Sequence, residues 1–137
     1  KLEKYSTKIS IEANDLVDLS LSQIIPAAVN YQNVLVKNVK GLKDIFGDEF
    51  KELAKDQMEL IRVISTHINA IKSATDQLIK ESKITKEISD HQKQAEAYSA
   101  NVKPLFDVIR YNSDELEELI DNNLWPLTKY REMLFTR

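Results

Sequence analysis

The sequence predicts an all-α fold: an antiparallel bundle of three long helices, kinked near Pro26 and Pro104, plus a short C-terminal helix. Apolar residues recur at spacings of three and four along most of the 137 residues, which is the period of an amphipathic helix. The chain has two glycines and three prolines, so residues that end helices are scarce. Few, long helices joined by short turns pack as an up-down-up bundle.

The first helix is expected from about Leu2 to Leu42. Its apolar stripe includes Leu2, Tyr5, Ile9, Ala13, Leu16, Ala27, Tyr31 and Leu35. Pro26 falls inside this stripe, where it removes the N–H that would bond the Ser22 carbonyl and clashes with that carbonyl. A kink near Ser22 is therefore expected. Two separate helices are the alternative, but no cluster of Gly, Asn or Asp marks a turn there.

Residues 44–48 are expected to form the first turn. Gly47 can adopt the positive φ that ends a helix, and Asp48 is expected to cap the next one. The second helix is predicted from about Glu49 to Ser82. Its stripe includes Phe50, Leu53, Ile61, Ile64, Ile68, Ile71 and Leu78.

The second turn is expected near residues 82–85, although no Gly or Pro marks it. The third helix is predicted from about Thr85 to Asn122, with a kink near Ala100 caused by Pro104. Its stripe includes Ile88, Ala95, Tyr98, Val102, Leu105, Ile109, Leu116 and Ile120. Pro126 then breaks the chain, and Thr128 is a suitable N-cap for a last short helix.

Composition limits the classes of partner. The formal net charge is −3, whereas proteins that bind phosphate backbones are usually basic, so nucleic acid is not expected as a partner. No apolar run approaches the roughly 18–20 residues of a membrane span, so no membrane is expected either. The chain has no cysteine, which excludes disulfides and fits the cytoplasm.

We expect no catalytic, cofactor-binding or metal-ligating residue in this chain. A helical metal site needs a Glu three residues before a His, but Ile64 and Ile88 stand there relative to His67 and His91. His67 lies among isoleucines and is expected to be a partly buried core or interface residue. Gly41 and Gly47 stand alone, so there is no Gly-rich phosphate loop.

An acidic cluster lies late in the third predicted helix. It could attract a cation or a basic partner, but apolar residues interleave with it at core spacing, which favours a solvated helix face. Negative charge near a helix C-terminus is unfavourable, and pairing with Lys129 and Arg131 can offset it. The cluster consists of Asp114, Glu115, Glu117, Glu118 and Asp121.

The most distinctive stretch is the end of the chain, from Leu124 to Phe135, which reads Leu-Trp-Pro-Leu-Thr-Lys-Tyr-Arg-Glu-Met-Leu-Phe. It resembles the end of type III glutamine synthetases, where the run is Trp-Pro-Leu-Pro-x-Tyr-Arg-Glu-Leu/Met-Leu-Phe. Residues 9–13 with 23–32, and less strongly 64–73, also resemble that family. Thr128 stands where the family more often has a second proline.

This resemblance implies that residues 1–137 are a single helical domain, the C-terminal fragment of a longer, cytoplasmic enzyme of nitrogen metabolism. The parent would ligate glutamate and ammonia using ATP and a divalent metal, Mg or Mn, with its active site outside this chain. The implied role of the fragment is structural. Its implied partners are its own catalytic domain and the neighbouring subunits of a homo-oligomer.

Two roles are open for the aromatic tail. It can cap the bundle's own core, or it can dock on the catalytic domain or a neighbouring subunit, since such interfaces are rich in aromatic residues. The candidate interface residues are Trp125, Pro126, Tyr130, Leu134 and Phe135. An independent helical binding or sensor module is the alternative function for the chain as a whole, because long amphipathic helices serve it equally well.

Overall fold

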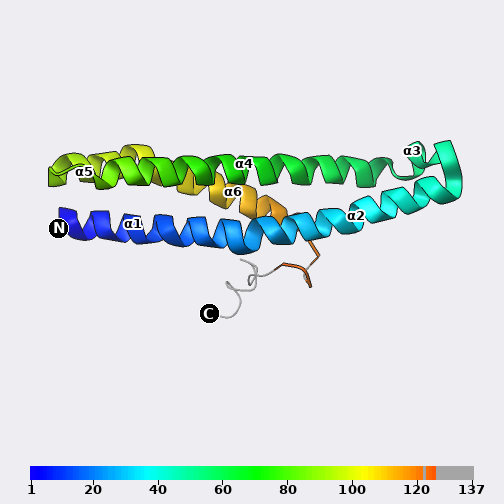
Figure 1. Cartoon of the computed structure of the whole chain (residues 1–137), viewed down its shortest axis with the longest axis horizontal. Coiled ribbons are helices and arrows are strands. Elements are labelled where there is room, and N and C mark those ends of the chain that lie inside the picture. Colours follow the sequence, from blue (N-terminus) through cyan, green and yellow to red (C-terminus); the bar gives the residue numbers. More distant parts are fainter. Residues whose placement is uncertain (122, 126–137) are drawn as a thin grey trace.

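The computed structural model describes residues 1–121 and 123–125, and this part of the chain is all-helical, which confirms the predicted class. Three helical runs lie side by side and alternate in direction (Figure 1). The first contains α1 (Leu2–Leu19), the π-helical turn η1 (Ser20–Ile24) and α2 (Ile25–Phe46). The second contains the 3-10 turn η2 (Gly47–Glu49), α3 (Phe50–Leu53) and α4 (Lys55–Lys86). The third contains α5 (His91–Ala97), the π-helical turn η3 (Tyr98–Val102) and α6 (Lys103–Leu119). The predicted short C-terminal helix falls outside the described residues.

Both helix-interior prolines lie two residues after the end of a π-helical turn. The Ile25 N–H reaches back five residues to the Ser20 carbonyl before Pro26, and the Lys103 N–H reaches the Tyr98 carbonyl before Pro104. A proline has no N–H to donate and crowds the preceding turn, and a wider turn gives its ring room. The helix thus passes each proline without ending. The bends themselves stay predictions.

The first turn matches the prediction at its glycine and differs at its cap. Gly47 has a φ of 60°, the left-handed region that favours glycine, and it ends α2. Asp48, however, makes no capping hydrogen bond, so its predicted role is wrong. The 3-10 turn begins at Gly47 and takes Asp48 into its interior, and the chain breaks once more at Ala54 before α4 begins.

The second turn lies four or five residues later than predicted. α4 continues through residues 82–85 to Lys86. Thr85 is buried and lies seven residues after Leu78, so it extends the buried face of the helix. Asp90 then caps α5: its side chain accepts a hydrogen bond of 2.9 Å from the Lys93 N–H. An aspartate at this position satisfies a backbone donor that the first helical turn leaves unpaired.

The core forms two clusters along the axis. The first, near the N-terminus, joins α1, α4 and the third run through Ile9, Ala13, Ala74, Leu78, Tyr98, Val102, Phe106 and Ile109. The second, at mid-length, contains Ile24, Ala28, Ile64, Ile71, Leu116, Ile120 and Trp125. All three runs supply residues to both clusters, and α4 does so as one helix through Ala74 and Leu78 in the first and Ile64 and Ile71 in the second.

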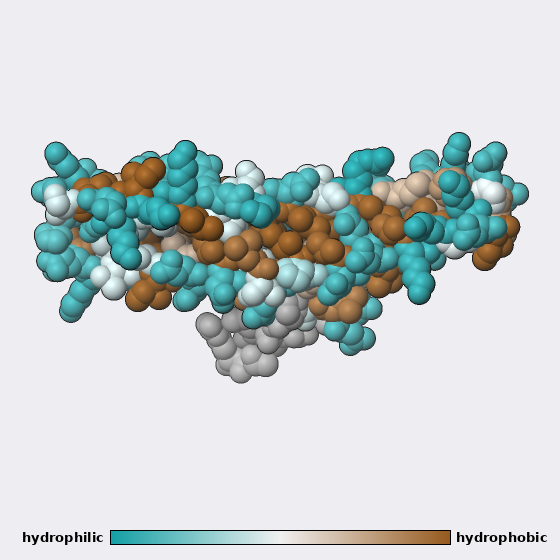
Figure 2. Space-filling view, in the orientation of Figure 1, coloured by the Kyte–Doolittle hydropathy of each residue, from teal (hydrophilic) through white to brown (hydrophobic). Residues whose placement is uncertain are grey.

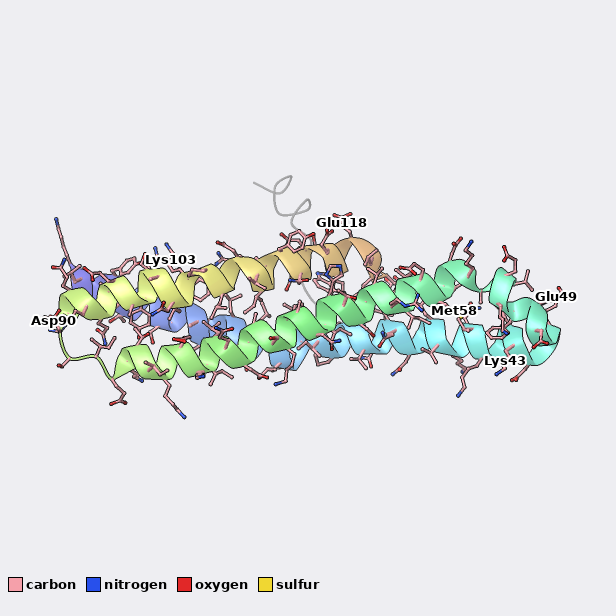
Figure 3. All side chains as sticks on the ribbon, turned by 90° about the horizontal axis from the view of Figure 1, so that it is seen from above. Lys43, Glu49, Met58, Asp90, Lys103 and Glu118 are labelled. Carbon is pink, nitrogen blue, oxygen red and sulfur yellow. The ribbon has the colours of Figure 1, made fainter. Side chains whose placement is uncertain are left out.

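The third run is shorter than the other two. It ends near Glu118, about half-way along the molecule, while the helices that carry Lys43 and Met58 continue past it to the turn at Glu49 (Figure 3). We call residues 29–63, where only two helices lie together, the hairpin arm. Ala54 is the only buried residue of this arm.

A second apolar surface lies on the flank of α4 that faces away from the third run. Ile61, Ile68 and Ile79 recur at helical spacing on this flank, offset from His67 and Ala74, which meet the third run. Ile79 is exposed, whereas Ile61 and Ile68 are partly buried and Ile68 packs against the second core cluster. Figure 2 shows apolar surface along the molecule between hydrophilic margins. Among the described residues, no helix combines the length and apolarity that crossing a membrane requires.

The first core cluster predicts where truncation is most harmful. Phe106→Ala removes a ring that is 1% exposed, and we expect the free energy of unfolding to fall by about 3–5 kcal/mol, because the cavity it leaves cannot collapse fully. Urea unfolding followed by circular dichroism measures this. The control is Val108→Ala, two residues away and 41% exposed, which should cost no more than about 0.5 kcal/mol. Equal losses in both variants would contradict the packing described here.

Candidate functional site

The tail begins inside the core of this chain. Trp125 is 7% exposed and belongs to the second core cluster, with Ile24, Ile64 and Leu116 around it. The remaining candidate interface residues, Pro126, Tyr130, Leu134 and Phe135, lie outside the described residues. The burial of Trp125 fits the first of the two roles left open for the tail, and the interface role of the set stays a prediction.

Asp121 directs Trp125 into the core. α6 ends at Leu119 and Ile120 turns to an extended conformation, with φ −87° and ψ 141°. The Asp121 carboxylate then accepts a 2.9 Å hydrogen bond from the Asn123 N–H, while its carbonyl accepts bonds from the N–H groups of Leu124 and Trp125. This is an Asx turn, which reverses the chain tightly. The sequence reasoning assigned Asp121 to an acidic cluster and missed this role, although the run Asp-Asn-Asn is a turn signal.

The indole of Trp125 has an unsatisfied donor. Its Nε1 is buried and finds no acceptor among the described residues. A buried N–H without an acceptor is costly, because it has lost its bond to water and gained nothing.

His67 joins α4 to α6 through a buried amide. Asn112 Nδ2 donates to the Val108 carbonyl at 2.8 Å, and Asn112 Oδ1 lies 2.8 Å from His67 Nδ1. A carbonyl can only accept, so the NH₂ group of Asn112 must face Val108 and its oxygen must face the histidine. His67 therefore carries its proton on Nδ1. The prediction of a partly buried interface histidine is confirmed.

The other histidine, His91, lies at the end of the molecule that carries the N-terminus. His91 Nε2 lies 3.5 Å from Glu3 Oε1, and both side chains are exposed. Nearby, Arg110 Nη2 lies 4.0 Å from Glu12 Oε2. Exposed ion pairs of this kind contribute little, about 0–1 kcal/mol. They mark contact between the first and third runs and do not form a reactive centre.

The acidic cluster is divided among different environments. Asp114 and Glu118 are exposed, whereas Glu117 is buried at the edge of the core. Hydrogen bonding with the Glu115 carboxylate, and its negative charge, raise the pKa of Tyr111 above the ordinary value of 10.0. Within the described residues, no three His, Cys, Asp or Glu side chains are grouped so that they could hold a metal ion.

A shallow hollow of about 640 Å³ lies between α1 and the third run. Its charged lining is mixed in sign, with Lys8, Lys103 and Arg110 against Glu12 and Asp107. The five side chains are exposed or only partly buried, and Lys103 lies 6.0 Å from the Tyr5 ring centre. A groove of this kind is a solvated seam between helices, and it places no nucleophile beside a base.

Known proteins with similar sequences identify the lineage. Residues 1–43 match the family model of the glutamine synthetase C-terminal domain. A glutamine synthetase of Bacteroides fragilis (strain YCH46) is 40% identical over 138 aligned residues, which cover 100% of this chain and 19% of that protein. A type-3 glutamine synthetase of Dictyostelium discoideum is 28% identical over 137 residues, which cover 98% of this chain and 18% of that protein. The chain belongs to the glutamine synthetase family.

The similarity assigns this chain to the C-terminal domain of that family. The chain spans about a fifth of the length of these relatives, with 19% and 18% of each covered. The family model covers α1, η1 and most of α2, which includes Pro26 and the π-helical turn before it. Trp125, His67 and Asn112 lie outside the range of that model, and their roles rest on the geometry given above.

The buried amide predicts a measurable coupling between α4 and α6. In Asn112→Ala the Nδ1–H of His67 loses its acceptor, and we expect a loss of about 1–3 kcal/mol in the free energy of unfolding. Urea unfolding at a pH well above the histidine range measures this. Asn101→Ala is the matched control, since Asn101 is exposed in the same helical run. Identical midpoints for the two variants would refute the proposed bond.

The Tyr111–Glu115 pair predicts a shifted titration. A carboxylate beside the phenol disfavours the negatively charged tyrosinate, so Tyr111 should titrate above 10.0. Glu115→Gln removes the charge, and the pKa of Tyr111 should then fall. The measurement is NMR of ring-labelled tyrosine, with Tyr111→Phe to assign the resonance. Glu118→Gln serves as control. A Tyr111 pKa that does not respond to Glu115→Gln would show that the pair is not formed.

Proposed function

We propose that this chain is the C-terminal structural and assembly domain of an enzyme that ligates glutamate and ammonia using ATP. The observation that carries the proposal is the similarity of the whole chain to glutamine synthetases of which it covers about a fifth. The active site of the parent, with its ATP and divalent Mg or Mn, belongs to the catalytic domain outside this chain. The parent acts in nitrogen metabolism in the cytoplasm.

The domain's task in this proposal is to pack on its own catalytic domain and to shape the contacts between subunits of a homo-oligomer. The apolar flank of α4 supports it. Ile79 on this flank is 43% exposed, and Leu21 of the first run is 42% exposed. Exposed apolar side chains that share one face with other apolar residues are typical of an interaction face. The antiparallel bundle, with bends at Pro26 and Pro104, presents that face as one long, stiff surface.

The test compares the full reading frame of the parent with a version that ends before Lys1. Both are scored for ATP-dependent glutamine formation and for particle mass by light scattering. Loss of the large particle on truncation supports an assembly role. Full mass and full activity after truncation refute it. Absence of ligase activity from the full protein would instead favour an independent helical binding or sensor module.

Single substitutions make the same test without removing the domain. In the full-length parent, Ile79→Lys places a charge on the proposed docking flank, and we expect the large particle to dissociate at a higher protein concentration than the unmodified protein does, because the weakened interface has a larger Kd. Gln77→Lys is the matched control, because Gln77 is exposed on another side of α4. Analytical ultracentrifugation compares the two. If both variants assemble like the unmodified protein, this flank is not the interface.

A further inference from the structure

The open flank of α4 and the outer side of α6 carry charges of opposite sign. The third run covers one face of the layer that the first run forms with α4, and Figure 2 shows the face that it leaves open. On this open face, two lysines of α4 line a hollow beside α1. On the opposite side of the molecule, residues 111–121 contain five carboxylates and no basic residue. The two sides are therefore electrostatically complementary to each other.

The hollow on the open face combines apolar walls with a basic margin. It measures about 240 Å³, and Ala13 and Val17 of α1 line it together with Ile79 of α4. The described residues around it include Lys83 and Lys86 and no carboxylate. Neither lysine forms an ion pair with a described residue, so both charges are free to bind a partner. We call these five residues the basic groove.

The outer side of α6 carries an acidic stripe. Four residues recur at intervals of four, three and four, which places them on one helix face, and all four are exposed: Asp107, Tyr111, Asp114 and Glu118. Figure 3 shows Glu118 on the margin of α6 that faces away from α4. The tyrosine is 61% exposed, which is unusual for so large a ring on a well-packed helix. We call these four residues the acidic ridge.

The groove and the ridge also match in spacing. Lys72 precedes Ile79 by seven residues and Lys86 follows it by seven, so lysines flank this isoleucine on both sides along one side of α4. Lys72 also pairs with Asp76. In the ridge, carboxylates flank Tyr111 on both sides in the same way. When the tyrosine meets the isoleucine, opposite charges therefore meet on either side of them, whichever way the two helices run.

The two surfaces cannot meet within one chain. The basic groove lies on the flank of α4 that faces away from the third run, and the acidic ridge lies on the outer side of that run (Figures 1 and 3). Contact between them requires a second copy, and each copy then offers its groove to one neighbour and its ridge to another. A repeated head-to-tail contact of this kind closes into a ring or continues as a filament. A homo-oligomer is the closed case.

We propose that the basic groove binds the acidic ridge of the same domain in a neighbouring subunit. Tyr111 of one copy packs on Val17 and Ile79 of the next, and the ridge carboxylates pair with Lys83 and Lys86. A central aromatic side chain with charged groups around it is the usual anatomy of a protein interface. The inference rests on the proposed assembly function and names the partner of the α4 flank.

Charge reversal in the full-length parent tests this pairing. Lys83→Glu with Lys86→Glu makes the groove negative like the ridge, and Asp114→Lys with Glu118→Lys makes the ridge positive like the groove. We expect each double variant to dissociate at a protein concentration about tenfold higher than the unmodified protein, because like charges then face each other. Co-expression of the two variants should restore the unmodified value, because each surface again meets one of opposite charge. Mass photometry over a dilution series measures this.

The matched controls make the same charge changes in the hairpin arm, outside both surfaces. Lys51→Glu with Lys55→Glu controls the first variant, and Asp44→Lys with Asp48→Lys controls the second, since all four side chains are exposed. Reversals that behave like these controls would overturn the proposal. Weakened assembly in both variants without recovery on co-expression would assign the two surfaces to different partners and would overturn it as well.

The outcomes separate this inference from the assembly function on which it rests. If the parent that ends before Lys1 keeps its full mass, the assembly function itself fails. If that truncation dissociates the particle while the reversals behave like their controls, the domain assembles through other surfaces, and only the pairing of groove and ridge is refuted.

Discussion

Packing on α4 is the interaction on which the rest of the structure depends. Its buried stripe supplies Ala74 and Leu78 to one core cluster and Ile64 and Ile71 to the other. The first and third runs lie on this stripe, and without it neither would bury its apolar face. The buried residues of this stripe run from Ile64 to Thr85, so one helix holds both core clusters in line. Where the third run stops, burial stops as well, and this accounts for the exposed arm.

Polar groups within this apolar framework fix how the elements meet. The Asn112 amide bonds both its own helix and His67, so only one axial register of α6 on α4 satisfies it. Gln32 does the same between α2 and α4, donating to the Ile61 carbonyl and to Ser65 Oγ. Two apolar stripes can slide along each other at little cost in free energy. A buried amide that loses its partners in such a shift stays desolvated without a hydrogen bond, which is unfavourable. These contacts give a long, narrow bundle a single alignment.

Membership of the glutamine synthetase family and the form of the domain suit each other. An assembly role requires a rigid domain whose apolar surface can bind another domain or subunit. This domain has an apolar flank along α4 and a hairpin arm that extends beyond its core. The flank is the surface that we propose meets the parent enzyme.

The sequence by itself determined the class, the three helical runs, the turn at Gly47 and the interface position of His67. These follow from apolar periodicity and from the single residue that tolerates a positive φ, which are local properties. The tertiary structure alone decided the helix limits at Asp90 and Leu119, the burial of Trp125 and the uncovered arm. Thr85 keeps α4 helical past the predicted turn because it is buried against neighbours that are remote in sequence. The run Asp-Asn-Asn signals a turn at Asp121, but the burial of Trp125 after that turn depends on neighbours that are remote in sequence.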